Sequence, residues 1–264
     1  MGSVEAYREL ATPPVLRAHV ACVWVSHDAE TRVLPDACVD VVLFGGRLLV
    51  AGPATTATVA GATPGRPRCG VRFRVGAAGA ALGVPAGELL DRGVALAELW
   101  GRAGARLEER AAAAPTSAQA LAVLTAGLAR RLPPPHVADP VVREAVLALR
   151  RDPGTPVAAL ARRVALGERH LRRRFERAVG YGPATLVRVQ RFQRFLALAA
   201  AHPGATLARL AADAGYADQA HLVRECRRLS GLAPSALLAT GAAPAGERSE
   251  AFKPEARGSG RLTA

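Results

Sequence analysis

The chain has 264 residues, enough for two domains of ordinary size with a core each. No stretch reaches the roughly eighteen uninterrupted apolar residues of a membrane span, and no apolar run follows a basic N-terminal stretch, so we expect a cytoplasmic protein without a membrane partner. The formal net charge is +13, and its distribution matters more than its size, because 34 of the 35 basic residues are arginines.

The first hundred residues are predicted to be rich in β-strand. Three short runs are rich in valine and leucine: residues 19–26, 38–44 and 47–51. Gly45–Gly46, between the last two runs, predicts a tight hairpin turn. Trp24 and Trp100 are expected in the core, because large aromatic side chains supply much of a small domain's buried area. We therefore assign residues 1–101 to a β-rich module.

Residues 102–132 are predicted to form a helical connector. Their apolar spacing is helical, with a break at Pro115, after which Thr116 or Ser117 can cap a new helix. The three prolines that follow Leu132 cannot continue a helix, so residues 133–139 are predicted to form a linker.

A second domain is predicted at residues 140–240, where the positive charge is concentrated. This segment holds 17 basic and 7 acidic residues, a net charge of +10, whereas residues 1–139 hold 14 and 12, a net charge of +2. Asp139–Pro140 combines a helix N-cap with a first-turn proline, and that helix is expected to stop at Asp152–Pro153. Residues 241–264 are poor in apolar side chains, and we expect a disordered tail. Such a basic segment is typical of a surface that binds phosphates.

The basic segment repeats itself at a period of about fifty residues. Residues 157–164 match residues 207–214 at an offset of 50, and residues 170–183 match residues 221–234 at an offset of 51. The extra residue is expected in a turn. Each copy is predicted to be a short helix, with a cap at Thr155–Pro156 or at Thr206, then a turn and a second helix rich in arginine, which is the helix-turn-helix pattern.

The second helix of each copy is predicted to enter the major groove of DNA, with its first residues at the base edges. In the first copy the exposed positions are Arg169, Arg172, Arg173 and Arg177. In the second copy the comparable positions are Gln219, His221 and Arg224. Arginine suits guanine and glutamine suits adenine, so the two copies are predicted to read different bases. Because His170 and His221 recur at matching positions, a structural bond to the backbone is favoured over base reading for both.

Residues 183–200, between the copies, have helical apolar spacing. Some 17 residues at about 1.5 Å each give roughly 25 Å of rigid spacer. That length suits two recognition helices placed near one 34 Å helical repeat of DNA apart. One chain is therefore predicted to read two adjacent major-groove segments.

Residues 140–240 resemble the DNA-binding domain of AraC/XylS-type transcription regulators. The resemblance rests on GYADQAHLVRECRRLSGLAP (residues 215–234) and LRRRFERAVGYGP (residues 171–183). It implies that six side chains face bases: Arg169, Arg172, Arg173, Gln219, Ala220 and Arg224. The chain departs from the family pattern at Ala165, where glycine is common in the turn, and at Gly167, where a serine or threonine cap is usual.

The N-terminal half resembles the small β-rich modules found ahead of such domains. The resemblance rests on PDACVDVVLF (residues 35–44), GVRFRVGAAGAALGVPAGEL (residues 70–89) and LAELWG (residues 96–101), and it implies a regulatory or ligand-sensing role. The expected fold is α+β with two domains: a β-rich sensor-like module with a helical connector, then an all-α domain of two helix-turn-helix units joined by a central helix. Expected partners are double-stranded DNA and RNA polymerase, with a small-molecule effector and a second copy of the chain as further candidates.

Several N-terminal side chains have a second interpretation. Asp36, Cys38 and Asp40 alternate, so a strand would put them on one face, where they would line a ligand pocket or bind a metal; the alternative is a turn acid, a buried thiol and a strand-edge acid. Arg72 and Arg74 are expected to face solvent. The chain has four widely spaced cysteines, without a CxxC pair, that are predicted to be reduced thiols: Cys22, Cys38, Cys69 and Cys226. No metal site and no cofactor are predicted.

Two other functions compete with regulated, sequence-specific DNA binding. The first is a β-barrel-like enzyme in the N-terminal half that the C-terminal half targets to DNA. The sequence contains no GxSxG, GxxxxGK[ST], HExxH or GxGxxG motif, so we predict that the chain is not an enzyme. The second is sequence-independent DNA binding, which predicts an affinity that salt abolishes and no preferred site.

Overall fold

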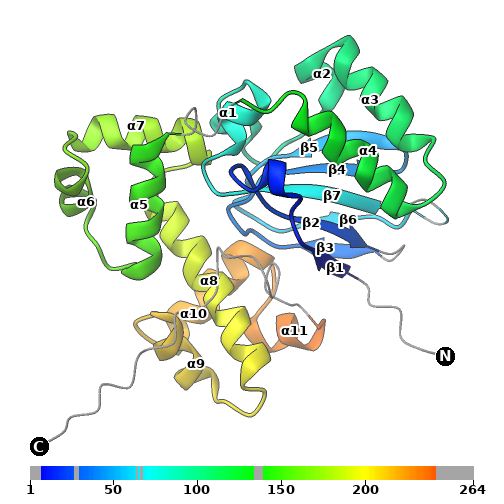
Figure 1. The fold of residues 1–264 in the computed structure, drawn as a ribbon. Coiled ribbons are helices and arrows are strands. Elements are labelled where there is room, and N and C mark those ends of the chain that lie inside the picture. Colours follow the sequence, from blue (N-terminus) through cyan, green and yellow to red (C-terminus); the bar gives the residue numbers. More distant parts are fainter. Residues whose placement is uncertain (1–6, 27–29, 64, 66–67, 134–138, 242–264) are drawn as a thin grey trace, which may run out of the picture.

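The computed structural model describes residues 7–26, 30–63, 65, 68–133 and 139–241. It has the predicted α+β architecture, with a β-rich N-terminal domain followed by a helical C-terminal domain (Figure 1). The predicted tail lies outside the described residues except for Gly241, as does most of the predicted linker. Among the described residues, no helix is long and apolar enough to cross a membrane.

The N-terminal domain is built on an open antiparallel sheet of six strands. In spatial order these are β1 (Tyr7–Leu10), β2 (Val20–Ser26), β7 (Arg68–Phe73), β4 (Asp40–Phe44), β5 (Arg47–Ala51) and β8 (Gly93–Ala95). A separate ribbon pairs β3 (Thr31–Val33) with β6 (Thr58–Ala60). The predicted hairpin is confirmed, because Gly45 and Gly46 have φ angles of 59° and 85° and join β4 to β5. Positive φ at both central residues is what the tight turn between right-twisted strands requires.

Both tryptophans lie in the core, as predicted. Trp24 on β2 lies beside Gly70 on β7, and a Cβ atom at position 70 would come within 2.5 Å of the indole ring. Only glycine leaves room for the ring there. The Trp100 indole donates a hydrogen bond of 3.1 Å to the Leu82 carbonyl and so ties α2 (Leu96–Trp100) to the end of α1 (Ala78–Leu82).

The predicted connector is helical, and it packs onto the sheet as a layer of the N-terminal domain. Helices α3 (Arg102–Ala112) and α4 (Ser117–Ala129) lie with α2 over one face of the sheet (Figure 1). Their buried leucines share one hydrophobic core with the strands. Thr116 caps α4 by accepting a hydrogen bond of 3.2 Å from the Gln119 amide, as predicted.

The C-terminal domain consists of seven helices around one core. These are α5 (Pro140–Arg151), α6 (Val157–Arg163), α7 (Glu168–Val179), α8 (Pro183–Ala201), α9 (Leu207–Ala214), α10 (Gln219–Ser230) and α11 (Pro234–Ala239). Helix α8 runs from the α5–α7 unit to the α9–α11 unit (Figure 1). The fully buried rings of Phe175, Phe192 and Phe195 belong to a core that both units share. Asp139 caps α5, and α5 ends at Arg151 with Asp152 as its C-cap, as predicted.

The N-terminal domain contacts both halves of the helical domain. Gly180, at the end of α7, packs so closely on Pro53 that an added Cβ atom would come within 2.4 Å of the proline ring. The buried Gln193 side chain of α8 donates a hydrogen bond of 2.7 Å to the Pro35 carbonyl. At the far end, the Ala57 amide donates a hydrogen bond of 2.7 Å to the Leu229 carbonyl of α10. One module therefore touches α7, α8 and α10.

Candidate nucleic-acid interface

The two helix-turn-helix units have the same turn. In the first, the Leu166 amide donates to the Ala161 carbonyl at 3.0 Å, and in the second the Tyr216 amide donates to the Ala211 carbonyl at 2.9 Å. These four residues match at an offset of 50. The second helices begin after N-caps at positions 167 and 218, an offset of 51, so the extra residue falls in the turn, as predicted.

The turns differ at one strained position. Gly215 ends α9 with a φ angle of 87°, and the matching Ala165 has a φ angle of 53°. Glycine adopts this left-handed backbone without a steric penalty, whereas alanine brings its Cβ atom close to the neighbouring carbonyl. The departure from the family pattern at Ala165 therefore corresponds to a turn of the same shape that carries backbone strain.

The caps of α7 and α10, the second helices of the two units, differ as well. Asp218 caps α10 by accepting a hydrogen bond of 2.6 Å from the His221 amide. Gly167 begins α7 and provides no side-chain cap. Helix α7 is held instead by Arg174, which makes two hydrogen bonds of 2.8 Å to Asp139, the residue that caps α5.

Asp139 is an ionised carboxylate in this arrangement. Burial raises its pKa, but hydrogen bonds from Arg174 and from the amides of Val142 and Val141 outweigh burial, so the net pKa lies below the usual value. The same carboxylate thus caps one helix and anchors another.

Most of the side chains predicted to contact DNA are exposed on α7 and α10. The exposed residues are Arg169, Arg172, Arg173 and Arg177 on α7 and Gln219, Ala220 and Arg224 on α10. None of the five arginines in this set forms an ion pair or a side-chain hydrogen bond with another described residue. Their positive charges are therefore uncompensated by the described part of the protein, which favours binding of phosphate or of guanine edges.

The two matching histidines have different surroundings. His221 is half-buried, and its Nδ1 atom accepts a hydrogen bond of 3.4 Å from the Ala217 amide in the turn. Its ring also packs edge-on against Tyr216, with 5.2 Å between the ring centroids. His170 is exposed and lines a pocket beside α7. The backbone bond expected at both positions is therefore found at His221.

The expectation that Arg72 faces solvent is wrong. Arg72 lies inside the N-terminal domain with only 7% of its surface exposed. Its guanidinium makes a bidentate pair with Asp40, at 3.1 and 3.0 Å, and a further ion pair of 3.1 Å with Asp36. A buried guanidinium needs an ion pair and hydrogen bonds, because an unpaired charge inside a protein is strongly destabilising.

The structural roles considered above as the alternative to a ligand or metal site therefore fit Asp36, Cys38 and Asp40. Asp36 is a turn acid that also accepts a hydrogen bond of 2.8 Å from the Cys38 amide, and Asp40 begins β4. Burial raises the pKa of the Asp40 carboxyl, and the Arg72 guanidinium opposes that rise. Within the described ranges, no group of three or more His, Cys, Asp or Glu side chains could hold a metal ion.

The four cysteines are free and buried. Burial raises the pKa of every one of these thiols, to about 12 for Cys69 and Cys226. The thiols are therefore protonated near neutral pH and are poor nucleophiles.

Sequence reasoning missed the residues that join α7 to the N-terminal domain. An added Cβ atom at Gly79 would lie 3.3 Å from the Arg177 carbonyl, and one at Gly87 would lie 3.3 Å from the Glu176 carbonyl. The sequence signal for this contact is the segment rich in glycine and alanine at residues 76–87, because such small residues permit close backbone approach.

Two family models match the chain. A helix-turn-helix domain model matches residues 160–240, and a model described as a domain of unknown function, DUF6597, matches residues 8–95. The first match spans α7 to α11, including both turns, and the second spans the sheet from β1 to β8. No curated protein and no solved structure matched. Residues 160–240 are therefore an AraC-type helix-turn-helix domain, which supports DNA binding and transcription regulation, and residues 8–95 are a domain of unknown function.

Proposed function

We propose that this regulator reads two adjacent major-groove segments, one with α7 and one with α10, and that its N-terminal module modulates the binding. The observation that carries the proposal is the repeated turn: two units with matching hydrogen bonds and exposed polar side chains at the start of each second helix share one core. In a helix-turn-helix unit, those early positions reach base edges.

Base preferences follow from the chemistry of the exposed side chains. Arg169, Arg172 and Arg173 on α7 favour a guanine-containing submotif, because a guanidinium can make two hydrogen bonds to the guanine edge. On α10, Gln219 suits adenine and Arg224 suits guanine. Arg177, two turns further along α7 than Arg169, is suited to a phosphate contact.

The length of α8 supports simultaneous contact by both units. Its 19 residues span about 28 Å at 1.5 Å per residue, close to the 34 Å repeat of B-form DNA. Because both units pack on this helix in a single core, their separation is fixed before DNA binds.

Modulation by the N-terminal module is supported by the surfaces that it touches. It packs on the C-terminal ends of α7 and α10, at Gly180 and Leu229, and holds α8 through Gln193. A change in the module therefore shifts the helices that would contact DNA. A small-molecule effector, RNA polymerase and a second copy of the chain stay predictions, and we propose no catalytic role.

Selection from a random duplex library tests the proposal. The full chain at near-physiological salt is expected to enrich two short submotifs about one helical turn apart. Arg173→Ala is expected to relax sequence preference in one submotif and Arg224→Ala in the other. Absence of any enriched motif, together with an affinity that salt abolishes, would instead indicate sequence-independent binding.

A further inference from the structure

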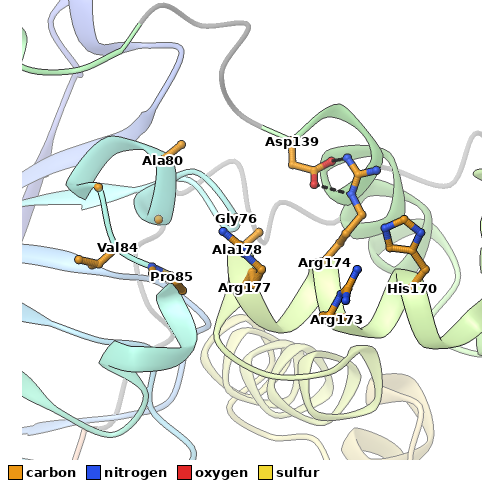
Figure 2. Close-up of a pocket in the computed structure, with 12 residues that line it drawn as sticks. Gly76, Ala80, Val84, Pro85, Asp139, His170, Arg173, Arg174, Arg177 and Ala178 are labelled. Carbon is orange, nitrogen blue, oxygen red and sulfur yellow. Dashed lines mark hydrogen bonds and ion pairs between the residues drawn. The ribbon is translucent and has the colours of Figure 1, made fainter.

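An open pocket of about 610 Å³ lies between the N-terminal module and α7. Figure 2 shows its two walls: Ala80, Val84 and Pro85 come from the module, and His170, Arg173 and Arg177 come from α7. The module wall is made of small, apolar residues, whereas the α7 wall is cationic. The volume lies within the range of pockets that hold small organic molecules.

The positive charge of the α7 wall is only partly compensated. Arg174 also lines the pocket, but its bidentate pair with Asp139 neutralises it (Figure 2). Arg173 and Arg177 have no ion pair or side-chain hydrogen bond with the rest of the described chain. They are one helical turn apart on α7, and two guanidiniums at that spacing can bind one anionic group together.

We propose that this pocket binds a small organic anion, a carboxylate or phosphate with an apolar body. The anionic group pairs with Arg173 and Arg177, because a guanidinium fork matches the geometry of carboxylate and phosphate oxygens. The apolar body lies against Ala80, Val84 and Pro85, where it is removed from water.

The position of the pocket couples the ligand to DNA. Arg173 is one of the side chains assigned to base contact, so this coupling rests on the proposed function. An anion that occupies Arg173 and Arg177 withdraws them from DNA, and linkage requires that DNA weakens anion binding by the same factor. The ligand is therefore an antagonist of the first unit, and it contacts the module and the recognition helix together.

Calorimetric titration of the full chain with octanoate, in the absence of DNA, tests the site. Octanol serves as the uncharged comparison, and inorganic phosphate serves as the anionic group alone. Two variants change the pocket from opposite walls: Arg177→Gln removes a cation, and Val84→Glu adds a negative charge to the apolar wall. Arg224→Gln is the matched control, because it removes an exposed recognition-helix arginine outside the pocket.

Saturable binding of one octanoate per chain is expected, with affinity at least tenfold lower in Arg177→Gln and Val84→Glu and unchanged in Arg224→Gln. Octanol and phosphate are each expected to bind more weakly than octanoate. The proposal is overturned if octanoate does not saturate, if Arg177→Gln binds it as the unchanged chain does, or if phosphate alone binds equally well. The last outcome would identify a bare phosphate contact.

Coupling is tested separately with a DNA duplex that the chain prefers. Octanoate is expected to raise the Kd for DNA in the unchanged chain and to leave it unchanged in Val84→Glu. Constant DNA affinity at saturating octanoate would overturn the coupling. Because the calorimetric titration contains no DNA, it tests anion binding in the pocket independently of whether the DNA-binding proposal holds.

Discussion

The two helix-turn-helix units share a fold but differ in what holds them. The first has an alanine in the left-handed turn, a second helix (α7) without a side-chain cap and close backbone contact with the N-terminal module. The second has a glycine in the turn and an aspartate cap, and it meets the module through the end of α10. The first unit is thus locally less favourable, and its backbone lies closer to the module.

The largest expected difference between the units lies at the C-terminal ends of α7 and α10. Gly180 and Gly231 both have positive φ, at 101° and 76°, but only Gly180 packs against Pro53. Gly180→Ala is expected to lower the free energy of unfolding by roughly 2–4 kcal/mol, from backbone strain and overpacking together. Gly231→Ala carries the strain alone, at about 1 kcal/mol. Urea denaturation of both variants measures the difference, and equal losses would show that the contact with Pro53 adds nothing.

A smaller, pH-dependent difference is expected at the aspartate caps. Asp139→Asn keeps a helix cap but removes the charge that pairs with Arg174, so it is expected to cost about 1 kcal/mol at neutral pH. Because the folded-state pKa of Asp139 is lowered, this stabilisation is present above the unfolded pKa of about 4 and disappears as the pH falls through the folded pKa.

Asp218→Asn is the control for that measurement, since Asp218 caps α10 and no ion pair of it is found in the described ranges. Denaturation midpoints between pH 7 and about 2 should converge for Asp139→Asn and the unchanged chain. A pH-independent gap would mean that the ion pair contributes nothing.

The smallest expected effect concerns the turn. Ala165→Gly is expected to raise the free energy of unfolding by less than about 1 kcal/mol, because relief of strain slightly exceeds the entropy that glycine adds to the unfolded chain. Gly215→Ala is expected to lower it by about 1 kcal/mol. Thermal denaturation of the pair checks the opposite signs, and two changes of the same sign would refute the assignment of strain to Ala165.

Local signals predicted much of the fold. Gly45–Gly46, Thr116, Asp139 and Asp152 act on their immediate neighbours, so the sequence alone placed the hairpin, a cap and both ends of α5. Comparison of the sequence with itself revealed the fifty-residue repeat, and that repeat predicted both turns.

Features that depend on distant residues could not be predicted. Arg72 is buried because Asp36 and Asp40 reach it from other parts of the chain. The local sequence around Phe73 gives no indication of these two carboxylates. The packing of α3 and α4 on the sheet, and the pocket beside α7, likewise arise from surfaces that come together only on folding.

Changing the spacing between the two selected submotifs tests most directly whether both units bind DNA at the same time and at a fixed separation. Inserting about five base pairs turns one submotif to the opposite side of the duplex, because one helical turn contains about 10.5 base pairs. The rigid spacing set by α8 predicts that affinity falls to that of a single submotif, and that the Arg224→Ala and Arg173→Ala losses no longer add. Unchanged affinity after the insertion would contradict simultaneous reading of two grooves by α7 and α10.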